Sequence, residues 1–212
     1  MRARALRRKA ALARRLLEAG NARFVAGTLR RQDRIAERRR ALTGGQAPFA
    51  SVLACSDSRV VPEMIFDRHI GDLFVARIAG NVVTDAVLGT FEFGHSVLGI
   101  ELIVVLGHEG CGAIAATYDA LINGTTLPPH LDEIERCIRP NIAHVVAAGG
   151  DKDEASVANA HAQTAQLMRS LVLRGAAAAG DVTIVPAEYR LGSGRVVFLE
   201  QPPLTSARTA NT

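Results

Sequence analysis

The chain has 212 residues, 48% of them hydrophobic, which is enough to bury one sizeable core. No apolar run approaches the roughly 18 residues of a membrane span, which excludes a transmembrane protein. The net charge of +4 is uneven, because residues 1–40 hold thirteen Arg and one Lys against three acids, and the rest of the chain is mildly acidic.

The basic segment, residues 1–42, predicts a helical arm. Two helices, over 5–27 and 30–42, end where Thr43-Gly44-Gly45 breaks the pattern. An apolar stripe at helical spacing favours a helix that docks on protein over a patch for nucleic acid or for a membrane surface. The stripe consists of Leu6, Ala10, Ala13, Leu17 and Phe24.

The basic N-terminal segment also helps to predict the cellular location of the protein. No apolar segment of a secretory signal follows it, so we expect the protein in the cytoplasm. An organellar transit peptide is an alternative, since such peptides are rich in Arg and poor in acids. Glu18, Asp33 and Glu37 within the segment disfavour that alternative.

Residues 46–200 predict an α/β core. Short apolar runs are typical of strands buried on both faces, and helical patterns alternate with them, which indicates a mostly parallel sheet flanked by helices. We predict one domain over 1–212, with a disordered tail at 202–212. The strands are predicted at 50–54, 73–78 and 102–106, the helices at 61–66, 84–98, 111–122, 131–148 and 153–174, and a closing hairpin at 182–185 and 195–199.

Two polar clusters follow buried strands of this sheet. Cys55-Ser56-Asp57-Ser58-Arg59 comes after the first strand, and Gly107-His108-Glu109-Gly110-Cys111-Gly112 begins where the strand at 102–106 ends. Ligands of open parallel sheets bind beyond the carboxyl ends of strands. If the two strands are neighbours, Cys55, His108 and Cys111 share one crevice. Two thiolates and one imidazole suit zinc, with the fourth tetrahedral position open as in a catalytic site.

Simpler interpretations exist for each residue alone. A cysteine at the end of a buried strand is often a small core residue, and Asp57-Ser58 resembles an ordinary turn. Cys137 lies in a helical pattern and is predicted to be an inert packing residue. Neither simple interpretation explains His108 and Cys111 at a second strand end. A redox dithiol enzyme would need C-x-x-C, which the sequence lacks.

The two clusters together resemble the beta-class carbonic anhydrases. Cys-Ser-Asp-Ser-Arg followed about fifty residues later by Gly-His-x-x-Cys-Gly is similar to that family's zinc-binding motifs, and the likeness covers roughly residues 10–200. It includes the segments Gly71–Arg77 and Ala79-Gly80-Asn81. The resemblance implies one zinc per chain and the reversible hydration of carbon dioxide to bicarbonate and a proton by zinc-bound hydroxide.

The same resemblance implies a catalytic dyad and a substrate pocket. Asp57 would accept a hydrogen bond from the attacking group while Arg59 pairs with its carboxylate. Ion pairing keeps the carboxylate charged, so it can only accept. Substrate-binding positions correspond to Gln46, Phe74, Phe93 and Gly112, with Phe93 where plant-type members carry Tyr. Other members of the family bind bicarbonate at a regulatory site with a Trp where this chain has Val52, so we expect no such site.

The resemblance also implies a homodimer or tetramer, with the N-terminal arm packed on a partner subunit. Two other functions stay open. A relative within the family hydrolyses carbonyl sulfide or carbon disulfide with the same zinc and dyad. A non-enzymatic zinc or nucleic-acid-binding protein would need neither Asp57 nor Arg59, so we expect no nucleic-acid partner.

Overall fold

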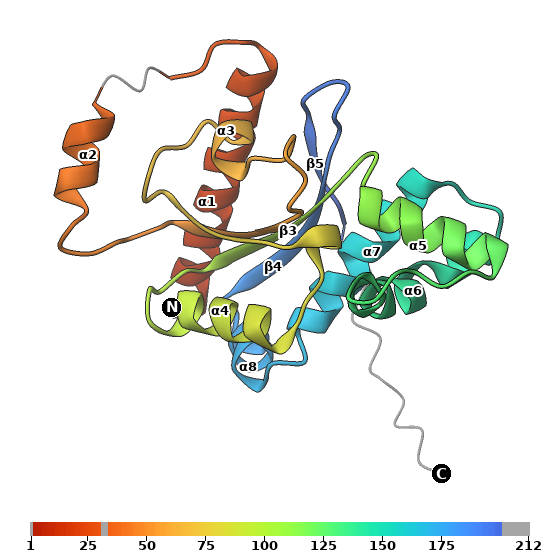
Figure 1. Ribbon diagram of the computed structural model, residues 1–212. Helices are drawn as coiled ribbons and strands as arrows, with labels where there is room; N and C mark the ends of the chain where they lie inside the picture. The colour runs from red at the N-terminus through yellow and green to blue at the C-terminus, as the bar shows by residue number, and fades with distance from the viewer. Residues whose placement is uncertain (1, 31–33, 201–212) are drawn as a thin grey trace.

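The computed structural model describes residues 2–30 and 34–200, with side chains from residue 8 onward (Figure 1). The side chain of Leu6, residues 31–33 of the predicted second helix and the tail predicted at 202–212 lie outside the described part. The elements are α1 (Arg2–Val25), α2 (Ile35–Ala41), β1 (Ala50–Ala54), α3 (Pro62–Ile65), β2 (Leu73–Arg77), the 3-10 turn η1 (Ala79–Asn81), α4 (Asp85–Ser96), β3 (Leu102–His108), α5 (Gly112–Asn123), α6 (Leu131–Ala147), α7 (Lys152–Leu167), α8 (Leu171–Ala179), β4 (Thr183–Tyr189) and β5 (Val196–Phe198).

Among the described residues the sheet has the order β2-β1-β3-β4-β5, and of these strands only β5 is antiparallel to its neighbour. The predicted mostly parallel sheet flanked by helices is therefore confirmed. From β1 the chain first adds β2 on one side and then crosses to β3 on the other, so strand order reverses between β1 and β3. A reversal of this kind opens a crevice at the carboxyl ends of the two strands.

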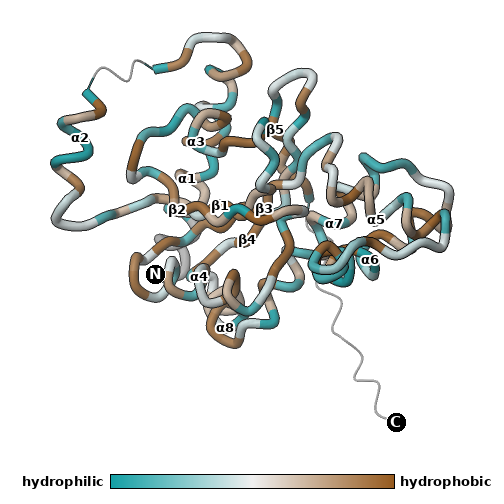
Figure 2. Tube along the Cα trace, in the orientation of Figure 1, coloured by the Kyte–Doolittle hydropathy of each residue, from teal (hydrophilic) through white to brown (hydrophobic). Residues whose placement is uncertain are grey.

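Helices cover both faces of the sheet. On one face, α1 packs on Val52, Val104 and Leu106 of the central strands. On the other face, α4, the end of α7 and α8 cover Leu53 and Ile103. A third apolar cluster lies at the carboxyl ends of β1 and β3, beneath α5, α6 and the start of α7. Figure 2 shows hydrophobic residues along the central strands, as strands buried on both faces require.

The second helix, predicted over 30–42, is shorter in the structure and spans Ile35–Ala41. Two further predicted elements differ from the structure. The helix predicted over 153–174 is two helices, α7 and α8, because the Ser170 side chain accepts a hydrogen bond from Leu173 N at 3.0 Å and caps a new helix. The strand predicted at 182–185 continues to Tyr189 through Pro186. Proline lacks an N–H but keeps its carbonyl, which here accepts from Leu199 N at 2.9 Å.

The N-terminal helix α1 packs on its own chain. Ala10, Ala13 and Leu17 of the predicted apolar stripe are buried in the core beneath the sheet, and Phe24 packs against the same cluster. The stripe therefore has a partner within the subunit, and packing on a second subunit stays a prediction. Among the helices of the described residues, none is long and apolar enough to cross a membrane.

Candidate metal centre and active site

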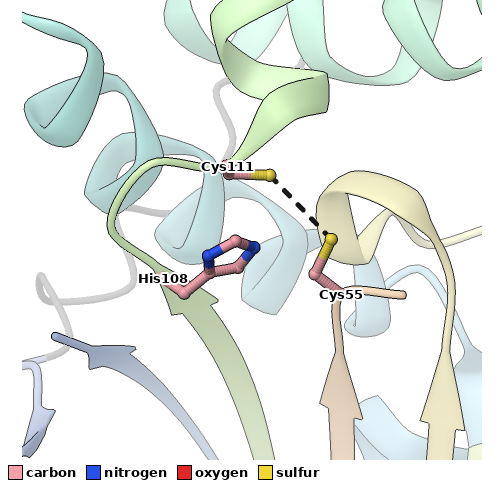
Figure 3. Close-up of side chains that lie close together, drawn as sticks. All are labelled: Cys55, His108 and Cys111. Atoms are coloured by element: carbon pink, nitrogen blue, oxygen red, sulfur yellow. Dashed lines mark hydrogen bonds between the residues drawn. The ribbon is translucent and has the colours of Figure 1, made fainter. Parts of the chain in front are cut away.

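Cys55, His108 and Cys111 converge where β1 and β3 end (Figure 3). Cys55 directly follows β1, and His108 is the last residue of β3, the neighbouring parallel strand. Cys111 precedes α5 as its N-cap residue. The two sulfurs are 3.9 Å apart, and the ligand atoms of all three residues lie within 4.8 Å of one another. The predicted convergence across one crevice is present.

One ring nitrogen of His108 is hydrogen-bonded, and the other is free to bind a metal ion. Its Nδ1 lies 2.8 Å from the carbonyl oxygen of Glu109, so the proton belongs on Nδ1 and Nε2 carries a free lone pair. Nε2 is buried and has no hydrogen-bond partner among the described residues. A buried polar atom without a partner is costly, and a metal ion bound through Nε2 would remove that cost.

The electrostatics of the two thiols also favour a bound metal ion. The hydrogen bond from Cys111 lowers the pKa of Cys55, assisted by the backbone N–H groups of Asp57 and Gly80. The neighbouring Cys55 and burial raise the pKa of Cys111. Cys55 therefore loses its proton readily, whereas Cys111 beside it tends to keep its proton. Two adjacent thiolates need a cation between them, so this donor set fits a metal site.

Asp57 and Arg59 form a two-pronged ion pair beside the three donors. Arg59 Nε donates to Asp57 Oδ1 at 2.9 Å and Arg59 Nη2 donates to Oδ2 at 2.7 Å. The Arg59 backbone N–H also donates to Oδ1, at 2.9 Å. These bonds from Arg59 hold the pKa of Asp57 well below its usual range. The carboxylate is therefore charged near neutral pH and acts only as an acceptor.

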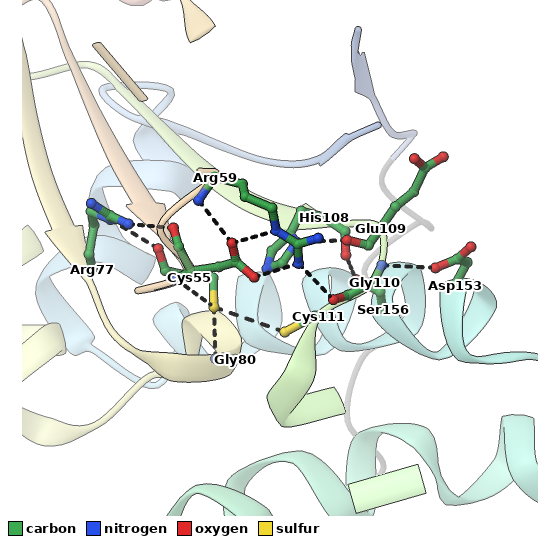
Figure 4. Close-up of polar contacts among 11 residues, drawn as sticks. Cys55, Arg59, Arg77, Gly80, His108, Glu109, Gly110, Cys111, Asp153 and Ser156 are labelled. Atoms are coloured by element: carbon green, nitrogen blue, oxygen red, sulfur yellow. Dashed lines mark hydrogen bonds and ion pairs between the residues drawn. The ribbon is translucent and has the colours of Figure 1, made fainter. Parts of the chain in front are cut away.

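The loop between β3 and α5 holds Arg59 from the other side (Figure 4). Arg59 Nη2 also donates to the carbonyl oxygen of Gly110 at 3.2 Å. The Gly110 N–H in turn donates to the carboxylate of Asp153, at the start of α7, at 3.2 Å. Arg77, at the end of β2, donates to the carbonyl oxygens of Cys55 at 3.0 Å and Asp57 at 2.6 Å. Both ligand segments are thus tied to neighbouring elements.

Sequence reasoning missed these supporting residues. Asp153 and Arg77 act through backbone atoms of other segments, and the sequence carries no spacing signal for such partners. Ser156 is a further case, because its hydroxyl donates to the carbonyl oxygen of His108 at 2.9 Å from one turn further along α7. Cys137 stands apart from the three-residue group and packs against the apolar cluster beside it, as predicted.

The predicted substrate residues lie in three places in the chain. Gly112 begins α5 immediately after Cys111, and it is exposed. Gln46 is exposed in the segment before β1. Phe74 on β2 and Phe93 on α4 stack with ring centroids 6.2 Å apart. Phe74 pairs with Ser51, four residues before Cys55, which places the aromatic pair about 13 Å back along the strands from Cys55 at the usual rise of about 3.3 Å per residue.

Comparison with known proteins settles the family. A family model described as carbonic anhydrase matches residues 50–196. The carbonic anhydrase of Mycolicibacterium smegmatis is 43% identical over 182 residues, which cover 85% of this chain and 88% of that protein. The chain belongs to the carbonic anhydrase family. Carbonic anhydrase 2 of Mycobacterium tuberculosis is 39% identical over 184 residues, covering 86% of this chain and 89% of that protein.

The solved structures give the class. The chain resembles one of the two tetrameric beta-carbonic anhydrases from the ascomycete Sordaria macrospora with a TM-score of 0.68 and 26% identity, over 77% of this chain and 86% of that one. The resemblance to beta-class carbonic anhydrases in the sequence is thus confirmed. Carbonic anhydrases are lyases, and the converging Cys55, His108 and Cys111 are compatible with the metal site of this class.

Proposed function

We propose that this chain is a zinc enzyme that interconverts carbon dioxide and bicarbonate, with Cys55, His108 and Cys111 as the zinc ligands. The observation that carries the proposal is the convergence of two buried sulfurs with a buried His108 Nε2 that has no partner among the described residues. Two thiolates and an imidazole match the preferences of zinc, and three protein ligands leave one tetrahedral position for chemistry. When bound, zinc acidifies water, which supplies a nucleophile near neutral pH.

Asp57 is proposed to orient the attacking oxygen. Because Arg59 keeps the carboxylate charged, Asp57 can accept a hydrogen bond from that oxygen's O–H but cannot donate one. The accepted bond fixes the direction of the remaining lone pairs. The new carbon–oxygen bond then forms between water oxygen and the carbon of carbon dioxide, and the proton released in the overall reaction passes to buffer.

Arg59 and the loop around Gly110 are proposed to keep this carboxylate in place. Arg59 spans Asp57 and the Gly110 carbonyl, so it links the segment after β1 to the segment after β3. Neither segment can shift without breaking a charged hydrogen bond. Gly112 follows Cys111 at the exposed start of α5, where a backbone N–H is available to a substrate oxygen.

A second copy of the chain is proposed to complete the substrate pocket. Phe74 and Phe93 lie about 13 Å along the strands from Cys55 of their own subunit, and Phe93 is 46% exposed, so they cannot wall the site beside that cysteine. The edge strand β2 and the stacked rings offer an apolar surface that a homodimer would bury. The tetrameric Sordaria relatives support a homo-oligomer. Gln46 is proposed to bind substrate oxygen in the same shared pocket.

The test combines stopped-flow carbon dioxide hydration with metal analysis of the same sample. We expect about one zinc per chain, loss of activity on chelation and recovery on adding zinc. Cys55→Ala should lose both metal and activity, because two ligands hold zinc weakly. A full zinc complement in that variant would contradict the ligand assignment. Zinc-loaded protein that hydrolyses carbonyl sulfide but does not hydrate carbon dioxide would contradict the proposed substrate.

A further inference from the structure

Helix α7 presents a row of buried polar side chains towards the metal centre. Ser156, Asn159 and Gln163 are spaced three and four residues apart, so they share one face of the helix. They are 3%, 0% and 1% exposed respectively. Buried amides and hydroxyls are costly unless every polar atom is bonded, so the partners of this row reveal what it holds.

The orientation of the Asn159 amide follows from its neighbours. The backbone N–H of Val83 donates to Gln163 Oε1 at 2.8 Å, and because a backbone nitrogen can only donate, Gln163 must present Nε2 to Asn159 Oδ1, 3.2 Å away. Asn141 Nδ2 donates to the same oxygen at 2.9 Å. Asn159 Nδ2 is therefore the donor to the carbonyl oxygen of Gly80, at 3.0 Å.

Gly80 connects this network to a ligand sulfur. Its φ of +67° is a conformation that favours glycine, and a Cβ added there would lie 2.6 Å from Cδ1 of Ile138. In this conformation the Gly80 N–H donates to Cys55 Sγ at 3.4 Å, as Figure 4 shows. Asn159 thus holds one end of Gly80 while the other end donates to Cys55.

We propose that Asn159 is a positioning residue of the metal centre, which holds Gly80 so that its N–H stays directed at the sulfur of Cys55. The proposal rests on the metal site proposed above. A hydrogen bond to a thiolate withdraws part of its charge, so the bound metal stays more positive and polarises its remaining ligand more strongly. This effect offsets the strong charge donation expected of two thiolate ligands. Ser156 holds the other ligand segment in place, because its hydroxyl donates to the backbone carbonyl of His108.

The test uses Co²⁺ alone as a probe, because its sulfur-to-metal absorption band reports the charge on the sulfur. Asn159→Ala and the shorter but polar Asn159→Ser both lose the bond to Gly80, and the serine keeps a partner for Gln163, which protects folding. The matched control is Asn141→Ala, which removes another buried bond to the same Asn159 oxygen but leaves the donor to Gly80 in place.

In both Asn159 variants we expect the band to move to longer wavelength, because the Gly80 N–H is no longer held at the sulfur, and a sulfur with a weaker hydrogen bond releases an electron more easily. Affinity for Co²⁺ should fall by about 10-fold, the low end of the range usual when a direct hydrogen-bond partner of a metal ligand is lost, because Asn159 acts through Gly80. The Asn141 variant should keep the wild-type band. A folded Asn159→Ser protein with the wild-type band, or an equal shift in Asn141→Ala, overturns the proposal. If the wild-type protein does not bind Co²⁺, the metal site itself is refuted.

Discussion

Two thiolates and an imidazole this close together form a site only with a cation. With their sulfurs 3.9 Å apart, Cys55 and Cys111 resist carrying two negative charges, and the buried His108 Nε2 adds a lone pair that has no partner in the described part of the chain. Asp57 behaves differently, because Arg59 neutralises it with two side-chain hydrogen bonds. At the scale of residues, the metal ligands and the carboxylate therefore have separate tasks, which substitutions should separate.

Asp57→Asn should keep the metal and lose activity. One amide oxygen can still accept from Arg59 N and Nε, but the amide nitrogen then faces Arg59 Nη2, and two donors repel. A neutral amide can also donate to the attacking oxygen, so its orientation is lost. We expect hydration to slow by about 10²–10⁴-fold, the usual range for such groups, with zinc content unchanged. Wild-type turnover at full zinc content would show that Asp57 is structural.

Arg59→Ala should depress activity most at low pH. Without Arg59 the pKa of Asp57 returns from its lowered value towards the ordinary value, so the carboxylate is still charged above pH 5 but no longer restrained. A free carboxylate beside the ligands can bind the metal itself, and it competes best where hydroxide is scarcest. A pH–rate profile tests this, with the surface variant Arg169→Ala as control. Parallel profiles for Arg59→Ala and wild type would contradict this role.

At the scale of elements, sequence reasoning succeeded where pattern and position coincide. The apolar runs predicted β1 and β3 correctly. Because ligands bind at the carboxyl ends of parallel strands, the sequence also predicted that Cys55 and His108 lie close together, which the pairing of β1 with β3 confirms. The break after Leu167 was missed because no Gly or Pro marks it and Ser170 resembles any polar helical residue. Asn159 was missed for a related reason, because its partner is the backbone of Gly80, which the sequence does not place nearby.

Ser170→Ala tests the break between α7 and α8. The Ser170 hydroxyl accepts from Leu173 N and donates to Glu92 at 2.6 Å, so alanine removes both a helix cap and a tie to α4. Loss of an N-cap costs about 1 kcal/mol, which corresponds to about 2–4 °C in melting temperature for a chain of this size. Carbon dioxide hydration should be unchanged. Thermal unfolding measures this effect, with the exposed Ser96→Ala as control, and an unchanged melting temperature would count against the cap.

At the scale of the whole molecule, α1 has two possible roles that a simple truncation cannot separate. Because Ala10, Ala13 and Leu17 are buried against the chain's own sheet, deleting residues 1–27 would expose that core and cause aggregation whether or not a second subunit is present. The oligomer is better probed where the single chain leaves apolar surface uncovered. Phe93 on α4, stacked on Phe74 of the edge strand, is such a place.

Phe93→Glu should dissociate the oligomer and reduce activity together. Because Phe93 is 46% exposed in the single chain, a charge there leaves the subunit folded, but burying that charge in an interface is costly. The control is Ile122→Glu on α5, where the replaced side chain is 59% exposed. Light scattering should give the mass of one chain for Phe93→Glu alone, with hydration lost and zinc retained. An oligomer of wild-type mass would place the interface elsewhere, and a fully active monomer would show that each subunit has a complete pocket.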